Sequence, residues 1–146
     1  MLLGKFTLPI NADGSFVLPL AYRKSLPGVA YLTQGFDRNL LLLPKSAFEK
    51  TCSNLNSTSI TDPLARLLSR LLLGNAIEIE LGSDSIIQVP STLCKFADLA
   101  NEIVLVGQGE FVELWSPSVW EEQSAILRDH ALNVQRFEKF HLTLAG

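Results

Sequence analysis

The chain has 146 residues, of which 47% are hydrophobic and 18% are charged, and its formal net charge is −3. A chain of this length buries enough surface for a core without metals or disulfides, and its two cysteines lack zinc-type or disulfide-framework spacing, which predicts a reduced, cytosolic protein. The longest uninterrupted apolar run, 40–44, is far shorter than the roughly 18 residues of a membrane span, and a charge at position 5 comes too early for a signal peptide.

The first 50 residues predict four strands and two helices. A strand over 6–10 meets a polar turn, and a second short strand over 16–18 stops at Pro19, which is placed to open a short helix over 20–25. Strands are then expected at 30–33 and 40–43, joined by a short link with a glycine that favours a hairpin. A closing helix follows.

The next segment predicts a linker and a helix. Residues 52–60 are rich in Ser, Thr and Asn, which is typical of a linker. Asp62 and Pro63 then begin a helix with a leucine stripe, and Gly74 is placed to end it. Arg66 and Arg70 lie one turn apart on the other face, where we expect salt bridges between subunits or repeats.

The second half predicts the same order of elements. Strands are expected at 77–81, 86–89, 103–106 and 111–114, and a short helix over 91–96 opens after Pro90. Ser116 is the expected N-cap of a closing helix with Pro117 at its first position. The helical pattern then continues along the tail and frays beyond about Phe140.

The two halves therefore read as a tandem repeat. Pro90 lies 71 residues after Pro19, and Asp84 lies 71 after Asp13. Gly107 follows Gly35 by 72 residues, as Trp120 follows Phe48. We predict an α+β fold made of two β-β-α-β-β-α units.

Charge and composition bear on partners. Residues 1–73 carry eight basic and four acidic side chains, whereas 74–146 carry four basic and eleven acidic ones. The basic half is compatible with phosphate contacts, although an ordinary solvated surface explains the same split. Charged residues fall below the ~25% of typical soluble domains, which predicts that another chain covers part of the apolar surface in an oligomer.

Three groups of residues, in this order along the chain, resemble the MraZ family of bacterial transcriptional regulators over roughly 1–122. They are Tyr31-Leu-Thr-Gln-Gly-Phe-Asp37, then Thr61-Asp-Pro-Leu-Ala-Arg66 with Arg70, and finally Val104-Leu-Val-Gly107 with Glu113-Leu-Trp115 and Trp120-Glu121. The resemblance implies two SpoVT-AbrB-type repeats that form a swapped-hairpin β-barrel pseudo-dimer within one chain. The expected parts are repeat 1 at 5–47, a linker and helix at 48–75, repeat 2 at 76–119 and a C-terminal helical tail at 120–146.

The resemblance also implies a function. Such a regulator forms a ring-shaped homo-oligomer in the cytoplasm, associated with the nucleoid. It binds double-stranded DNA at short direct repeats upstream of its own cell-division and cell-wall operon, and usually represses that operon. We expect no cofactor, no membrane contact and no small-molecule ligand.

The chain departs from the family at the residues thought to face DNA. The family pattern has Asp and, four positions later, Arg in both repeats, but here those positions are Asn11 and Ser15, then Gly82 and Ile86. Neither serine nor isoleucine replaces the phosphate and guanine contacts of arginine. The remaining candidates for DNA contact are Lys5, Asn11, Ser15, Arg23 and Lys24. An ordinary solvated helix end explains Arg23 and Lys24 equally well.

The sequence predicts neither a catalytic nor a metal site. His130 and His141 are eleven residues apart, which excludes a helical i,i+4 ligand pair, and Cys94 is best explained as an apolar helix residue. Two functions stay open. One is a DNA-binding regulator of the MraZ type; the other is a scaffold of the same fold that has lost DNA recognition and acts through protein partners.

Overall fold

The computed structural model describes residues 1–58 and 60–142 and has an α+β fold, as the sequence predicts. Ser59 of the predicted linker and the last four positions of the predicted tail lie outside the described residues. No helix in the described ranges is both long and apolar enough to cross a membrane.

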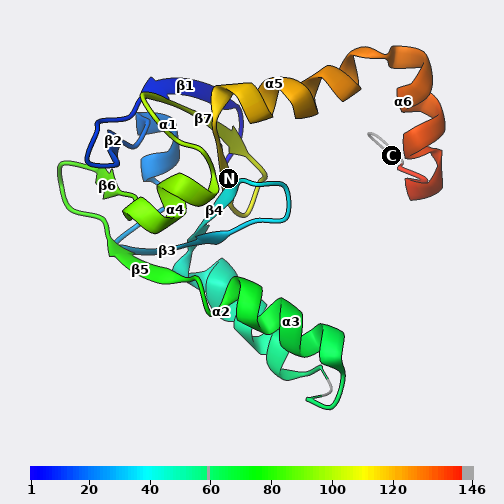
Figure 1. The fold of residues 1–146 in the computed structure, drawn as a ribbon, viewed down its shortest axis with the longest axis horizontal. Coiled ribbons are helices and arrows are strands. Elements are labelled where there is room, and N and C mark those ends of the chain that lie inside the picture. The colour runs from blue at the N-terminus through cyan, green and yellow to red at the C-terminus, as the bar shows by residue number, and fades with distance from the viewer. Residues whose placement is uncertain (59, 143–146) are drawn as a thin grey trace.

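The strands form two antiparallel sheets (Figure 1). The larger sheet has six strands, in the order β1 (Lys5–Pro9), β7 (Glu102–Gly107), β8 (Val112–Trp115), β4 (Leu40–Pro44), β3 (Val29–Gln34) and β5 (Ile77–Glu80). The smaller sheet is a ribbon of two short strands, β2 (Ser15–Val17) and β6 (Ile86–Gln88).

Each half of the chain gives its first strand to the other half. β1 pairs with β7 of the second half, and β5 pairs with β3 of the first. β4 pairs with β8 and β2 with β6, and in these pairs equivalent residues face each other: Leu41 pairs with Glu113, and Phe16 with Ile87. Equivalent residues pair directly only around a pseudo-twofold axis, so the predicted exchange of hairpins between the halves is present.

The repeat alignment predicted from the sequence is wrong by one residue along β3 and its counterpart β7. β3 begins at Val29 and β7 at Glu102, which are 73 positions apart rather than 72. Burial agrees with 73, because Ala30 and Leu32 enter the core as Ile103 and Leu105 do. The hairpin loop that follows is one residue shorter in the second half, at 108–111 against 35–39, and restores the offset of 72.

The core lies between the six-stranded sheet, the ribbon and two short helices, α1 (Leu20–Arg23) and α4 (Ser91–Phe96). Both helices follow a proline, which fixes φ and removes the ladder donor where the ribbon strand has to end. Tyr22 of α1 is fully buried, donates its hydroxyl hydrogen to the Gly4 carbonyl at 2.8 Å and meets the Phe6 ring edge-on. The core is built from both halves, chiefly Phe16, Leu18, Leu32, Leu40, Leu42, Ile87, Val89, Ile103, Leu105 and Leu114.

Two longer helices cover part of the outer face of the six-stranded sheet. α5 (Pro117–Ala125) packs there over a cluster that includes Trp115, whose ring centroid lies 5.5 Å from that of Trp120. α2 (Lys45–Asn56) occupies the equivalent place in the first half, where Phe48 stacks on Tyr31 at 4.1 Å between centroids. The predicted cap of α5 is confirmed, because the Ser116 hydroxyl accepts a hydrogen bond from the Val119 amide.

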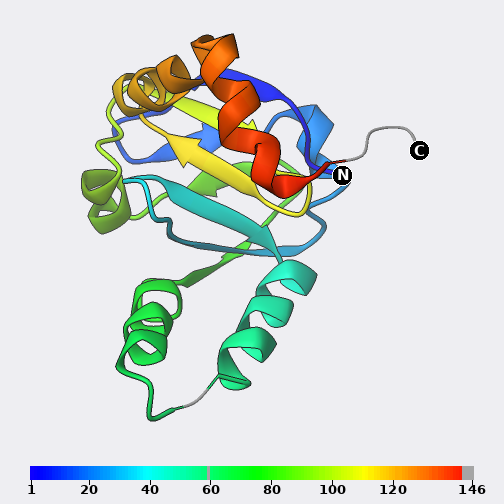
Figure 2. The ribbon, with the colours of Figure 1, turned by 90° about the vertical axis from the view of Figure 1, so that its right-hand side faces the viewer.

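The predicted linker over 52–60 is wrong in its first half, because α2 continues to Asn56. Cys52 and Leu55 follow Phe48 by four and seven residues and are half-buried on one helix face, so apolar spacing outweighs the weak helix propensity of Ser, Thr and Asn. The start of α3 (Pro63–Leu72) is confirmed, since Asp62 accepts from the Leu64 amide at 2.9 Å. α2 and α3 reach away from the sheets as a pair (Figures 1 and 2).

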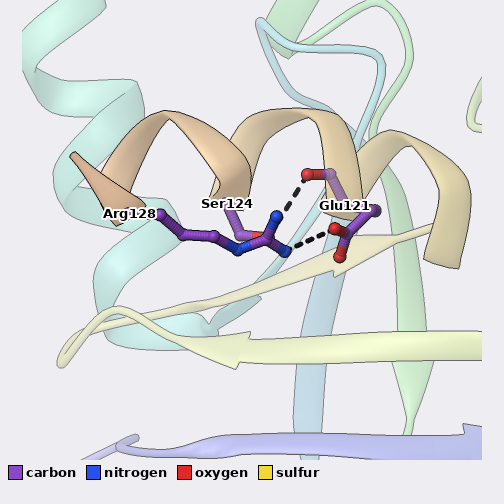
Figure 3. A network of polar contacts seen from close by, with 3 residues as sticks. All are labelled: Glu121, Ser124 and Arg128. Atoms are coloured by element: carbon purple, nitrogen blue, oxygen red, sulfur yellow. Dashed lines mark hydrogen bonds and ion pairs between the residues drawn. The ribbon is translucent and has the colours of Figure 1, made fainter.

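The tail is helical but interrupted. After α5 come a short 3-10 turn, η1 (Ile126–Arg128), then α6 (His130–Phe137) and η2 (Glu138–Phe140). Arg128 pairs with the Glu121 carboxylate and the Ser124 hydroxyl donates to the Glu121 carbonyl, which holds η1 against α5 (Figure 3). Asp129 has an extended backbone and caps α6 through the Leu132 amide, so the expected continuous helix is broken at this cap.

Candidate nucleic-acid interface

A turn precedes each strand of the ribbon, and the two turns have the same hydrogen-bonding pattern. Asp13 accepts a hydrogen bond from the Ser15 amide at 3.0 Å, and Asp84 accepts from the Ile86 amide at 3.1 Å. A carboxylate that binds the amide two residues ahead makes an Asx turn. Gly14 and Ser85 both have positive φ, at 86° and 57°, at the equivalent place in each turn.

One face of the ribbon points away from the core. Because side chains alternate along a strand, Phe16 and Ile87 enter the core while their neighbours turn outward. Ser15 pairs with Gln88 and Val17 with Ile86. Ser15 and Ile86 are therefore diagonal neighbours, about 7–8 Å apart in such a pair, on the same outer face.

The two diagonal positions have very different surroundings. Ser15 is 8% exposed; its hydroxyl donates to Asp13 at 2.6 Å and accepts from the Asn11 amide group at 3.0 Å. These bonds from the Ser15 hydroxyl and amide hold the pKa of the Asp13 carboxyl below its usual value. Ile86 is 45% exposed and apolar. Polar groups at the first turn are thus engaged with one another, and the second offers a bare hydrocarbon surface.

Arg23 and Lys24 lie at the other end of the ribbon from Asn11 and Ser15. The Arg23 Nε donates to the Leu18 carbonyl at 3.1 Å, and Arg23 shares a cavity of about 190 Å³ with Gly82 and Ser85 of the second turn. Lys24 beside it is exposed.

A lysine absent from the five predicted residues occupies the equivalent place in the second half. Lys95 follows Lys24 by 71 residues, is exposed on α4, and lines a cavity of about 380 Å³ with the first turn. Cys94 takes the place of Arg23, and its thiol donates to the Val89 carbonyl at 3.6 Å, the counterpart of the Leu18 carbonyl. Burial raises the pKa of this thiol. The repeat offset of 71 was the signal that could have found Lys95.

Lys5 lies apart from the ribbon. Its ammonium nitrogen is 5.6 Å from the centroid of the Trp120 ring, on the side of the sheet that α5 covers. The five predicted residues thus fall into three places: Asn11 with Ser15, Arg23 with Lys24, and Lys5 alone. In the described ranges, no group of three or more His, Cys, Asp or Glu side chains is arranged to hold a metal ion.

Comparison with known proteins identifies the family. The family model described as "MraZ protein, putative antitoxin-like" matches residues 72–139. The protein named "Transcriptional regulator MraZ" from Thermomicrobium roseum is 35% identical over 127 residues, which covers 87% of this chain and 89% of the relative. The protein of that name from Nitrosospira multiformis is 38% identical over 121 residues, covering 79% and 82%. The chain belongs to the MraZ family.

Because relatives in the MraZ family are named as transcriptional regulators, the ribbon is the part of the structure to compare with DNA. A two-stranded ribbon fits the major groove of B-DNA, and here Lys24 and Lys95 stand at symmetry-related places on the helices that follow its strands. The outward ribbon face itself carries no charged side chain, because its residues are Ser15, Val17, Ile86 and Gln88. In this MraZ chain the positive charge near the ribbon therefore lies at the end of α1, on Arg23 and Lys24, and on Lys95 of α4.

Proposed function

We propose that the chain is an oligomeric, DNA-binding transcriptional regulator that presents the β2–β6 ribbon to double-stranded DNA. The names of its relatives support regulation of transcription. The observation that carries the proposal is the symmetric ribbon, with its two Asx turns and with Lys24 and Lys95 on the helices behind it.

Within this proposal, the contacts divide by chemistry. Lys24, Lys95 and Arg23 neutralise phosphates on either side of the ribbon, and such contacts supply affinity without sequence information. Asn11 and Ser15 act at the first turn, whose shape they hold through their mutual hydrogen bond. Lys5 reaches a more distant phosphate from the edge strand.

We infer that two SpoVT-AbrB-like repeats, 5–47 and 76–119, build this interface together, with the linker and helix at 48–75 and the tail at 120–146 outside it. The exchange of β1 and β5 between the halves supports that division. A ring of such subunits binds short direct repeats upstream of its own division and cell-wall operon and represses it, in the cytoplasm at the nucleoid. Each subunit then needs only weak contacts, because linked sites multiply affinity.

One observation favours a second function, a scaffold that has lost DNA recognition. Val17 and Ile86 are 53% and 45% exposed on the ribbon face, and Leu20, three residues after Val17, is 75% exposed. An apolar ribbon face suits a protein partner better than a phosphate backbone.

Binding to DNA from upstream of the chain's own gene, followed by fluorescence anisotropy across a salt series, tests the proposal. We expect tighter binding than to a scrambled duplex, and Lys24→Gln and Lys95→Gln should each lower the salt slope by about one per bound subunit. Lys139→Gln, on the tail, is the matched control and should leave the slope unchanged. Equal or absent binding to both duplexes would overturn the regulator and leave the scaffold.

A further inference from the structure

We propose that α3 of one copy docks on the outer face of the six-stranded sheet of the next copy, with Arg70 paired to Glu113 of that neighbour. The inference rests on the homo-oligomer of the proposed function and names the surfaces that build it. It follows from two surfaces of the described chain that lack a partner and are complementary in chemistry.

The first surface is the outward face of α3. Leu64 and Leu67 are 73% and 57% exposed and lie one turn apart, whereas Leu72 at the end of the helix is buried. Arg70 follows Leu67 by three residues and so flanks this apolar stripe. Exposed leucines on a helix that projects from the body (Figure 2) are typical of a protein–protein contact.

Among the described residues, the guanidinium of Arg70 has no partner, whereas that of Arg66 has one. Arg66 turns back along its own helix and donates to the Ile60 carbonyl at 3.0 Å. Within residues 1–58 and 60–142, Arg70 makes no ion pair, and the ion pairs there join other side chains. The salt bridges that the sequence predicted for both arginines are thus not made inside one described chain.

The second surface is a mainly apolar groove of about 250 Å³ between α2, the end of α3 and the outer face of the sheet, with the Lys50–Glu110 ion pair also in its lining. Its apolar lining comes from Phe36, Leu41, Leu43, Phe48, Phe111 and Leu72. Phe36 is 68% exposed. The groove therefore offers aromatic and aliphatic side chains to an incoming apolar helix face.

Glu113 stands at the edge of this groove, because its direct cross-strand partner is Leu41 and Phe111 lies two residues before it. Its carboxylate accepts hydrogen bonds from the Asn39 amide group at 3.1 Å, the Gln108 amide group at 3.0 Å and the Trp115 indole at 3.3 Å. All three donors are neutral, and no described cation pairs with it.

A half-buried carboxylate without a cation is unfavourable, and burial raises the pKa of Glu113 despite the three donors. Asp37 adds to the negative potential there. The arriving surface carries leucines and a free guanidinium, and the receiving surface carries a groove and an unpaired carboxylate. Because the two surfaces differ, the contact is head-to-tail, the type that closes into rings.

Zero-length crosslinking tests the pair. In Arg70→Lys, a carbodiimide should join the introduced amine to Glu113, and a mixture of ¹⁴N- and ¹⁵N-labelled subunits should give that crosslinked peptide with mixed isotopes, as expected between copies. Arg66→Lys is the matched control and should give no bond to Glu113. Lys50 and Glu110, 3.6 Å apart within one chain, provide an internal positive control.

Sedimentation of the same samples separates the possible failures. A monomer would overturn both the oligomer and this contact. An oligomer in which the amine introduced by Arg70→Lys fails to reach Glu113, or in which Glu113 instead crosslinks to Lys139 of a neighbouring tail, would overturn the contact alone.

A second pair of variants does not depend on crosslinking. Leu64 and Val134 are 73% and 75% exposed on α3 and α6, so a serine at either position leaves the fold intact. Leu64→Ser should raise the dissociation constant between subunits on the order of tenfold, and Arg70→Ala by about tenfold to a hundredfold. Val134→Ser should leave it unchanged, and the reverse ranking would contradict docking by α3.

Discussion

Gly14 and Ser85 occupy the same place in the two ribbon turns, but only the glycine adopts the backbone conformation found there without strain. Both have positive φ, where a residue with a Cβ is strained and glycine is not. At Gly14 an added Cβ would also lie 2.3 Å from the Val89 carbonyl oxygen. The second turn thus holds a strained backbone that the first avoids.

We predict that Ser85→Gly raises the free energy of unfolding by up to about 1 kcal/mol, because it removes the strain at positive φ. Gly14→Ala should lower it by more than that, since it adds both strain and a clash. Urea unfolding of the two variants beside the parent measures both effects. A loss of stability in Ser85→Gly would mean that the Ser85 side chain contributes more than its backbone costs.

At the scale of the element, the ribbon offers two positions for a restored arginine, and they are not equivalent. Ser15 is buried, and its hydroxyl bonds Asp13. An arginine at position 15 would lack that bond, and its longer side chain would have to point out of the turn. Ile86 is already half exposed on the outer face, so a longer charged side chain fits without rearrangement.

Ile86→Arg should therefore strengthen DNA binding and steepen its salt dependence by about one unit per bound subunit. Ser15→Arg should cost stability with less gain in binding. Val134→Arg places the same charge on the tail, where Val134 is 75% exposed, and controls for net charge. If Ile86→Arg and Val134→Arg bind DNA alike in the anisotropy assay, the ribbon does not face the duplex.

Elements with local signals could be predicted from the sequence. Pro19 and Pro90 end the ribbon strands, and Asp62 with Pro63 begins α3, because each acts through its own backbone or cap. The end of α2 could not be predicted that way, since its last turn is held by apolar spacing in a polar stretch.

The candidate site was only partly predictable for a similar reason. The burial of Ser15 has a local source, because its hydroxyl bonds Asp13 and Asn11, two and four residues earlier, and Ile86 has no hydroxyl to make such bonds. The exposed fractions of the two side chains still depend on how the ribbon packs, which the local sequence does not specify. Glu113 stands out only in three dimensions, because one of its donors, Asn39, comes from the other half of the chain. Hydrophobic periodicity likewise does not say which strand is whose partner.

At the scale of the whole molecule, neither half has a complete sheet of its own. Among the described strands, β1 and β2 of the first half are hydrogen-bonded only to β7 and β6 of the second half. Likewise, β5 and β6 are hydrogen-bonded only to β3 and β2, so each half alone would leave two strands without their partners. Core residues such as Phe16 and Ile87 also meet across the halves.

Separate fragments 1–75 and 76–146 should therefore remain largely unfolded by circular dichroism, and mixing them should restore β-structure. The intact chain at the same concentration is the reference. A fragment that gives a cooperative unfolding transition by itself would show that the exchanged strands are dispensable for folding.

The exchange of strands also determines when β1 can pair during synthesis of the chain. β1 begins at Lys5, but its partner begins at Glu102, 97 residues later. At about 5–20 residues per second, the ribosome needs several seconds to deliver that partner. Throughout that interval the growing chain carries strands without their partners, and unpaired strand edges favour aggregation until the second half has been made.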